Sequence, residues 1–276
     1  QERAELIMLS DIAGYVGADT CGCLLAIRQD QQEEISLMID IGTNGEMVLG
    51  NRERMVTCST AAGPAFEGAQ IECGMRGAAG AVDHVKYEDG KWNYTTVGNK
   101  PAVGLCGSGL IDLVAGLLEA GMLDENGVLR SGQEKQGVFI LVPPERGGNE
   151  RGVYLTQKDL GEVQLAKAAI AAGIQMLMER LGITEEDICS VYIAGAFGNY
   201  MDPVSAGKIG LLPATLVKKV KPVGNAAGEG AKIALVNEKE MLEMDELVRK
   251  IEFVELAASA DFQDHFIDEL GFETGE

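Results

Sequence analysis

Three apolar segments of the sequence each end in a run of small residues, and these junctions hold the side chains best suited to bind a ligand. The junctions are residues 39–46, 193–198 and 223–228. Each apolar segment has the composition of a buried strand, and α/β proteins build ligand sites where such strands reach the edge of the sheet. We therefore expect the junctions to converge on a site at one edge of a sheet.

The first junction has the chemistry of a phosphate-binding loop. Gly42 lets the backbone turn its amides toward an anion, and Thr43 and Asn44 can hydrogen-bond to the oxygens of that anion. Asp40, at the end of the apolar segment, could bind Mg²⁺ through water, and it is our candidate for both the metal ligand and the catalytic residue. An ordinary hairpin with a buried aspartate has the same residues, so that interpretation stays open.

The second junction suits a nucleoside, because a turn with few side chains lets a ribose or an adenine ring lie flat against the backbone. The candidate adenosine contacts are Gly195, Ala196, Phe197 and Gly198. Taken alone, this junction also fits close packing of a helix against the sheet. In the third junction, the candidate contacts are Gly224 and Asn225.

A further glycine-rich stretch, residues 104–109, adds Gly107 and Ser108 to the candidate nucleotide contacts. Its glycines are spaced G-x-x-G-x-G, and no acidic residue ends a second strand about 20 residues later, so we expect no Rossmann-type dinucleotide site. The two histidines, His84 and His265, have no carboxylate or nucleophile at an informative spacing. We therefore expect no metal-binding or triad role for them.

The composition of the 276-residue chain limits its partners. Acidic residues outnumber basic residues 43 to 23, and the formal net charge of −20 repels nucleic acids and anionic membrane surfaces. The sequence predicts no transmembrane span and no signal peptide. Its six cysteines form no C-x-x-C pair, which predicts reduced, mostly buried thiols in a cytoplasmic protein.

Apolar periodicity and turn signals predict an α/β fold with a mixed central sheet, helices on both faces and a β-ribbon insertion. Strands are expected at residues 35–41, 46–50, 188–194, 217–223 and 251–256, and helices at 2–9, 18–28, 110–120 and 157–181. Insertions are expected at about 61–100, which is glycine-rich and holds the ribbon, and at about 124–152, which is polar.

Specific residues mark the ends of several elements. Asn44-Gly45 predicts a type I′ hairpin turn, and Asp89-Gly90 predicts the turn of a ribbon over residues 82–97. Thr156 and Gly182 should cap the long helix, and Asp202-Pro203 should begin another.

Taken together and in this order, the three junctions resemble the second half of the fold shared by actin, sugar kinases and heat-shock chaperones, the ribonuclease H-like class called ASKHA. The resemblance implies that residues 40–44 are the second phosphate loop and residues 195–198 the adenosine loop of an ATP site. It also implies that residues 1–34 hold connector helices from an upstream domain and that residues 35–276 form the second ASKHA domain. The adenosine loop of this class usually has two successive glycines, whereas Ala196 takes the second position here.

Longer stretches are similar to the C-terminal ATPase region of reductive activators of corrinoid proteins. They are residues 15–20, 40–46, 63–75 and 224–228, and the similarity extends from about Asp11 to residues 262–266. The resemblance implies a protein that uses ATP and Mg²⁺ to move an electron from an iron-sulfur cluster to the cobalt of a partner corrinoid protein, which restores Co(I). It also places Glu67, Glu72 and Arg76 near the cleft that binds ATP. The alternative is that these three side chains lie on the outer surface of the protein.

Members of that family carry an upstream [2Fe-2S] ferredoxin-like domain and a first ATPase half, and we expect both to be missing from this chain. The resemblance therefore implies an ATP-binding half-site that is inactive alone. One alternative is a small-molecule kinase with Asp19 as its catalytic residue, and another is a docking module for a corrinoid protein without enzymatic activity. Activation of a radical dehydratase would need cluster-ligating cysteines that the sequence lacks. The sequence is also compatible with a homodimer.

Overall fold

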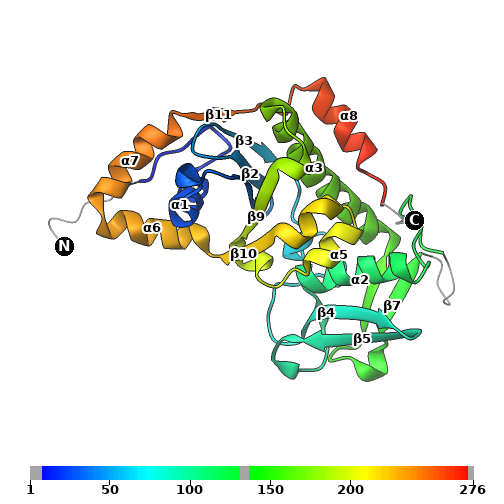
Figure 1. The fold of residues 1–276 in the computed structure, drawn as a ribbon. Coiled ribbons are helices and arrows are strands. Elements are labelled where there is room, and N and C mark those ends of the chain that lie inside the picture. The colour runs from blue at the N-terminus through cyan, green and yellow to red at the C-terminus, as the bar shows by residue number, and fades with distance from the viewer. Residues whose placement is uncertain (1–7, 131–136, 273–276) are drawn as a thin grey trace.

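The computed structural model describes residues 8–130 and 137–272, except for the side chain of Ala196. Its centre is a six-stranded sheet in the order β10-β9-β1-β2-β3-β11 (Figure 1). These strands are β1 (Ile35–Ile41), β2 (Gly45–Gly50), β3 (Met55–Thr60), β9 (Ile188–Ala194), β10 (Val220–Gly224) and β11 (Ile251–Phe253). The first three strands form an antiparallel meander, whereas β9 runs parallel to β1, β10 to β9 and β11 to β3. The sheet is therefore mixed, which confirms the predicted fold class.

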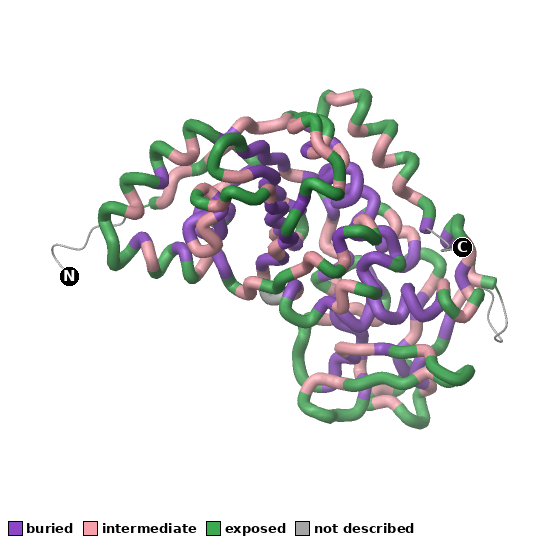
Figure 2. Tube along the Cα trace, viewed as in Figure 1, coloured by how far each residue is buried: buried purple, intermediate pink, exposed green. Residues whose placement is uncertain are grey.

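Helices cover both faces of this sheet (Figure 1). One face carries α1 (Ala18–Ile27), α6 (Ala226–Val236) and α7 (Glu238–Val248). The other face carries α3 (Gln157–Leu181), against which α8 (Ala260–Asp268) packs. Figure 2 shows that the central strands and much of α3 are buried, and burial on both faces explains why β1 is a nearly continuous apolar run.

Alternate residues of β1 face these two layers, because side chains along a strand point to opposite faces in turn. Leu37 and Ile39 belong to the main core, whereas Met38 packs in a separate cluster with Cys23 and Leu24 of α1. The same alternation directs Asp40 toward α1. The position of this carboxylate therefore follows from the register of the strand.

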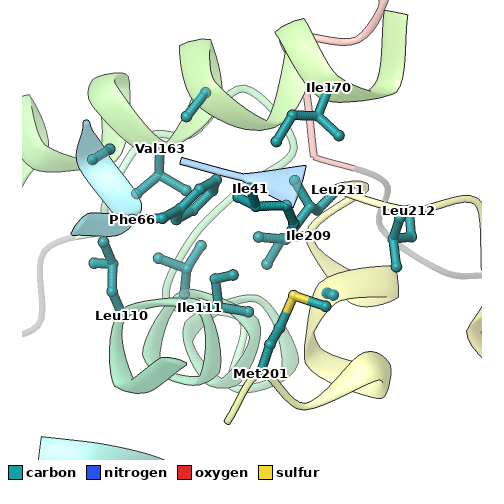
Figure 3. Close-up of a cluster of buried hydrophobic side chains, with 14 of the residues drawn as sticks. Ile41, Phe66, Leu110, Ile111, Val163, Ile170, Met201, Ile209, Leu211 and Leu212 are labelled. Atoms are coloured by element: carbon teal, nitrogen blue, oxygen red, sulfur yellow. The ribbon is translucent and has the colours of Figure 1, made fainter. Parts of the chain in front are cut away.

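A smaller lobe is inserted between β3 and α3. It contains β4 (Ala81–Glu88), β5 (Lys91–Thr96), β6 (Gly104–Leu105), α2 (Gly107–Glu119), β7 (Val138–Val142) and β8 (Val153–Thr156). The β4–β5 ribbon turns at Asp89 and Gly90, as predicted, and their φ angles of 51° and 74° fit a type I′ turn. In Figure 3, Phe66 lies between Leu110 of α2 and Val163 of α3, so one core joins the two lobes.

Helix caps follow the signals in the sequence. The Thr156 side chain accepts a hydrogen bond from the Asp159 N–H in a capping box, and α3 ends at Gly182 with a left-handed φ of 70°. The Asp202 side chain accepts from the Val204 N–H at the start of α5 (Pro203–Lys208). All three of these predicted caps are confirmed.

Some predicted elements differ in the structure. Neither Asn44 nor Gly45 has a positive φ, so the predicted type I′ turn is wrong, and residues 42–44 close the hairpin as a three-residue loop. Gly45 serves close packing instead, because a Cβ there would lie 2.9 Å from Oγ1 of Thr60 and 3.2 Å from Cγ1 of Ile170. Residues 195–198 form a short helix, α4 (Gly195–Gly198), where the sequence predicts an open turn.

The strand expected at 217–223 begins later, at Val220, because a 3₁₀ helix occupies Ala214–Lys219. The helix expected at residues 2–9 lies mostly outside the described residues, and residues 8 and 9 are not helical. Within the described residues, no helix combines the length and apolarity that crossing a bilayer requires. All six cysteines are free thiols, and Cys189 alone among them is exposed.

Candidate functional site

The ends of three neighbouring strands meet at one edge of the sheet. Asp40 of β1 pairs with Ala194 of β9, and Ala194 in turn pairs with Gly224 of β10. Because the three strands are parallel, the segments that follow them leave the sheet on the same side. A Cβ on Gly195 would lie only 3.0 Å from Oδ1 of Asp40, which shows how closely the first two junctions approach each other.

Asp40 lies in a half-buried acidic environment. Burial and the nearby charge of Asp19 raise the pKa of Asp40. Burial and Asp19 also raise the pKa of Glu46, which pairs with Asp40 across β1 and β2. The Cys23 thiol, whose pKa is raised to about 12 by burial, lies 3.9 Å from Oδ2 of Asp40 as a weak donor. A cation at this place would relieve the repulsion among the carboxylates.

The loop after β1 presents both donors and an acidic neighbour. The Thr43 hydroxyl donates to Oε1 of Glu67 at 2.7 Å, and the Thr43 carbonyl accepts from the Gly63 N–H at 2.8 Å. Thr43 and Asn44 are exposed, and their own N–H groups make no hydrogen bond within the part of the chain that the structure describes. Two backbone donors therefore remain available at the loop tip.

The residues after β9 begin α4 and then form an aromatic wall. Gly195 has a φ of 85°, and α4 carries Ala196, Phe197 and Gly198 away from the sheet edge. The Phe197 ring stacks on Phe66 with a centroid distance of 5.7 Å and an interplanar angle of 14°. This stack joins the second junction to the segment that holds Glu67.

A pocket of about 540 Å³ opens beside that stack, within the range of small-molecule sites. It is lined by Phe66, Glu67, Met75, Arg76, Gly77, Asp83, Val97, Gly98, Cys106, Gly107, Ser108, Phe197 and Tyr200. Three predicted contacts, Gly107, Ser108 and Phe197, therefore line one cavity. Glu67 lines it too and accepts the Thr43 hydroxyl, so this side chain links the pocket to the phosphate-loop candidate.

Other predicted residues lie outside this pocket. The Asn225 side chain accepts from the Gly228 N–H at 3.0 Å and caps α6, and a Cβ on Gly224 would contact Asn199. Both still belong to the same sheet edge through β10. Glu67 and Arg76, which the resemblance placed near the cleft, line the pocket, whereas Glu72 is not among the residues that line it. Asp83 was not predicted, because its partner Ser108 lies 25 residues away along the chain. The pair Thr43–Glu67 carries no local spacing signal that could have identified it.

The chemistry of Asp40 fits a water-mediated Mg²⁺ contact. No group of three or more His, Cys, Asp or Glu side chains that could hold a metal occurs in residues 8–130 and 137–272. Mg²⁺ in nucleotide sites commonly takes one or two carboxylates, the phosphates and several waters, so a full protein cage is not required. Gly195 leaves open space beside Oδ1 of Asp40 that a Cβ would occupy.

Each histidine contacts a carboxylate that the spacing along the sequence did not indicate. His84 Nδ1 lies 3.1 Å from Oδ2 of Asp112, and His265 Nε2 lies 2.9 Å from Oε1 of Glu179. Burial raises the pKa of Asp112. Folding brings each pair together from different elements, so the spacing along the sequence gave no sign of either contact.

The chain is similar in sequence to two proteins whose names contain the word corrinoid. The corrinoid activation enzyme RamQ of Eubacterium limosum is 38% identical over 271 residues, covering 93% of this chain and 45% of that protein. The [Co(II) methylated amine-specific corrinoid protein] reductase of Methanosarcina barkeri is 30% identical over 296 residues, covering 99% of this chain and 52% of that protein. The chain thus spans about half the length of these curated relatives.

A solved structure and a family description agree with these relatives. The reductive activator for corrinoid, iron-sulfur protein superposes with a TM-score of 0.89 at 40% identity, covering 96% of this chain and 44% of that one. Residues 34–276 match the family described as the C-terminal domain of RACo, the ASKHA domain. The sheet order, the junctions at its edge and this match agree, and the chain belongs to the family of the C-terminal ASKHA domain of RACo.

Proposed function

We propose that this chain is the ATP-binding half of a reductive activator of a corrinoid protein. The observation that carries the proposal is the approach of Asp40 to Gly195 at one sheet edge, beside a pocket of about 540 Å³. Relatives of about twice this length have corrinoid activation or reduction in their names. In the proposal, a first ATPase half and a [2Fe-2S] domain precede this chain in the intact protein.

Each junction has a distinct task in this proposal. Residues 42–44 bind the phosphates through the free N–H groups of Thr43 and Asn44 and through the Thr43 hydroxyl, which rests on Glu67 in the free chain. Asp40 holds Mg²⁺ through water, and the bound ion neutralises phosphate charge. Gly195 and α4 support the ribose, and Phe197 directs the base into the pocket that Gly107 and Ser108 line. Gly224 and Asn225 complete the edge of the sheet beyond the ribose.

Electrostatics favours binding of ATP as its magnesium complex. Asp19, Asp40 and Glu46 are close enough that Asp19 raises the pKa of both other carboxylates. Free ATP would add further negative charge to this cluster, in a chain whose formal net charge is −20. We therefore expect Mg²⁺ to be required for binding and not only for hydrolysis.

The packing of α1 on α6 supports a conformational role for the nucleotide. A Cβ on Gly22 of α1 would lie 2.7 Å from the Ala227 carbonyl oxygen of α6, so the two helix backbones pass in close contact. Packed helices slide past each other in shear motions when lobes close on a ligand, and we propose such a motion for this pair. In the intact protein, such closure would couple ATP hydrolysis to transfer of one electron from the reduced cluster to Co(II), giving Co(I).

Calorimetry tests the proposal directly. ATP with Mg²⁺ is titrated into this chain and into the full-length protein, and ATP with excess chelator serves as the comparison. We expect binding with Mg²⁺ only and loss of binding in a Thr43→Val variant. A Thr215→Val variant, which removes an exposed hydroxyl that contacts Glu185 outside the site, should bind normally. If neither protein binds ATP with Mg²⁺, the proposal is wrong.

A second measurement addresses the partner. The full-length protein, reduced at its cluster, is mixed with the oxidised corrinoid protein, and formation of Co(I) is followed by absorbance with and without ATP. We expect Co(I) only with ATP. Nucleotide binding by the full-length protein but not by this chain would assign the chain a half-site and docking role.

A further inference from the structure

The ribbon strand β4 contains an irregularity at the pocket. Val82 pairs with Thr96 of β5 and His84 pairs with Thr95, so Asp83 is an extra residue with no partner of its own in the ladder. Such β-bulges change the direction of a side chain and occur often beside active sites. Here the bulge residue Asp83 lines the 540 Å³ pocket.

The start of α2 fixes this bulge in place. The Ser108 hydroxyl donates to the Asp83 carbonyl at 2.8 Å, and the Cys106 N–H donates to the Val82 carbonyl at 3.1 Å. A Cβ on Gly109 would collide with that same Val82 carbonyl, so the helix can approach only because this residue is glycine. The glycine-rich start of α2 therefore determines where the Asp83 carboxylate lies.

Asp83 and α2 present an acceptor next to donors. Oδ1 of Asp83 accepts the Thr95 hydroxyl at 2.6 Å, which leaves Oδ2 as an acceptor for a ligand. The N–H groups of the first helical turn have no partner within a helix, and no side chain among the described residues caps α2 at Cys106. Gly107 and Ser108, in that turn, line the same pocket.

This arrangement matches one edge of adenine. Adenine presents its 6-amino donor beside the N7 acceptor, whereas guanine presents two acceptors, O6 and N7, on that edge. A carboxylate would accept from the amino group of adenine and repel O6 of guanine. Stacking of the base on the Phe66–Phe197 wall would be equally favourable for both purines, so Asp83 is the group that can discriminate between them.

We propose that Asp83 is the specificity-determining residue of the nucleotide site, selecting adenine through its 6-amino group, and that Ser108 is the positioning residue that holds Asp83. This inference rests on the proposed ATP-binding function. It adds to that function the residue that recognises the base and the structural reason for the glycine-rich start of α2.

The experiment compares ATP and GTP, each with Mg²⁺, by calorimetry on the full-length protein and on this chain. We expect the wild type to prefer ATP, and Asp83→Asn to lower the ATP-to-GTP affinity ratio about 10- to 100-fold, because an amide can donate to O6. Ser108→Ala should lower the ratio by a smaller factor. Asp89→Asn is the matched control, since Asp89 is exposed at the tip of the same ribbon and asparagine tolerates its φ of 51°.

The outcomes separate the two proposals. A wild type that binds ATP and a D83N variant that keeps its preference for ATP would overturn this inference and leave the ATP-binding function standing. A wild type that prefers GTP would also overturn it. A wild type that binds neither nucleotide would overturn both proposals. Thermal unfolding of D83N, expected to match D89N, shows that a change in the ratio comes from the pocket and not from loss of folding.

Discussion

Replacing Gly195 by alanine separates the backbone requirement at this position from its effect on the site. Gly195 has a φ of 85°, in the left-handed region, which costs an L-residue about 1–2 kcal/mol. Gly182, which caps α3, has a φ of 70°, and no heavy atom of the described residues lies within 4 Å of a Cβ placed there. Both G195A and G182A should therefore lose about 1–2 kcal/mol of folding stability.

Only one of these variants should affect nucleotide binding. In G195A the new methyl group would lie 3.0 Å from Oδ1 of Asp40, so this carboxylate must shift. Displacing a group that orients a metal typically costs about 10- to 100-fold in metal affinity, and we expect ATP with Mg²⁺ to bind more weakly by that factor. Calorimetry measures the affinity and thermal unfolding measures the stability. Unchanged binding by G195A, or an equal loss in G182A, would refute the reasoning.

Three further predictions concern buried charges and thiols. D40N should bind ATP with Mg²⁺ poorly yet melt at a higher temperature than wild type at pH 7, because the raised pKa of Asp40 means that its ionised form destabilises the fold. That gain should vanish in melts below pH of about 4, where the wild-type carboxyl is protonated in both states, and a constant difference would contradict it. E269A should cost about 1 kcal/mol in denaturant unfolding, because it removes the acceptor of the Gln175 side-chain amide at 2.6 Å and a charge 3.9 Å from the buried Lys167 ammonium. An unchanged unfolding midpoint in E269A would argue against this account. A thiol reagent should label native protein quickly at Cys189 alone, because this is the exposed thiol. Fast labelling that persists in C189S would mean that a second cysteine is accessible and would contradict this prediction.

Signals that act within a few residues were predicted well from the sequence. The caps at Thr156 and Gly182 and the ribbon turn at Asp89-Gly90 depend on hydrogen bonds and φ angles among near neighbours. Local signals fail where packing decides. Asn44-Gly45 has the residues of a type I′ turn, yet Gly45 pairs with Ile41 at the start of β2. Glycine is required there by packing, because Thr60 and Ile170 leave no room for a Cβ.

The candidate site was predicted in part. Asp40, Thr43 and Gly195 follow strands, and the rule that parallel strands end at one edge brings them together from the sequence pattern alone. The resemblance placed Glu67 near the cleft, but its contact with Thr43 and the position of Asp83 in the pocket came only from the tertiary structure. Glu67 reaches the site through Thr43, and Asp83 enters the pocket through a bulge that no periodicity predicts.

The sequence by itself determined most strands and helices, their main caps and the strand ends that carry small residues, because hydrophobic period and turn chemistry are encoded locally. It did not predict β3 or the β7–β8 pair. Only the tertiary structure decided which walls form a pocket. The stack of Phe66 on Phe197 and the bond from Ser108 to Asp83 join segments distant in the chain. Such contacts depend on how the layers pack, and packing is a property of the whole core.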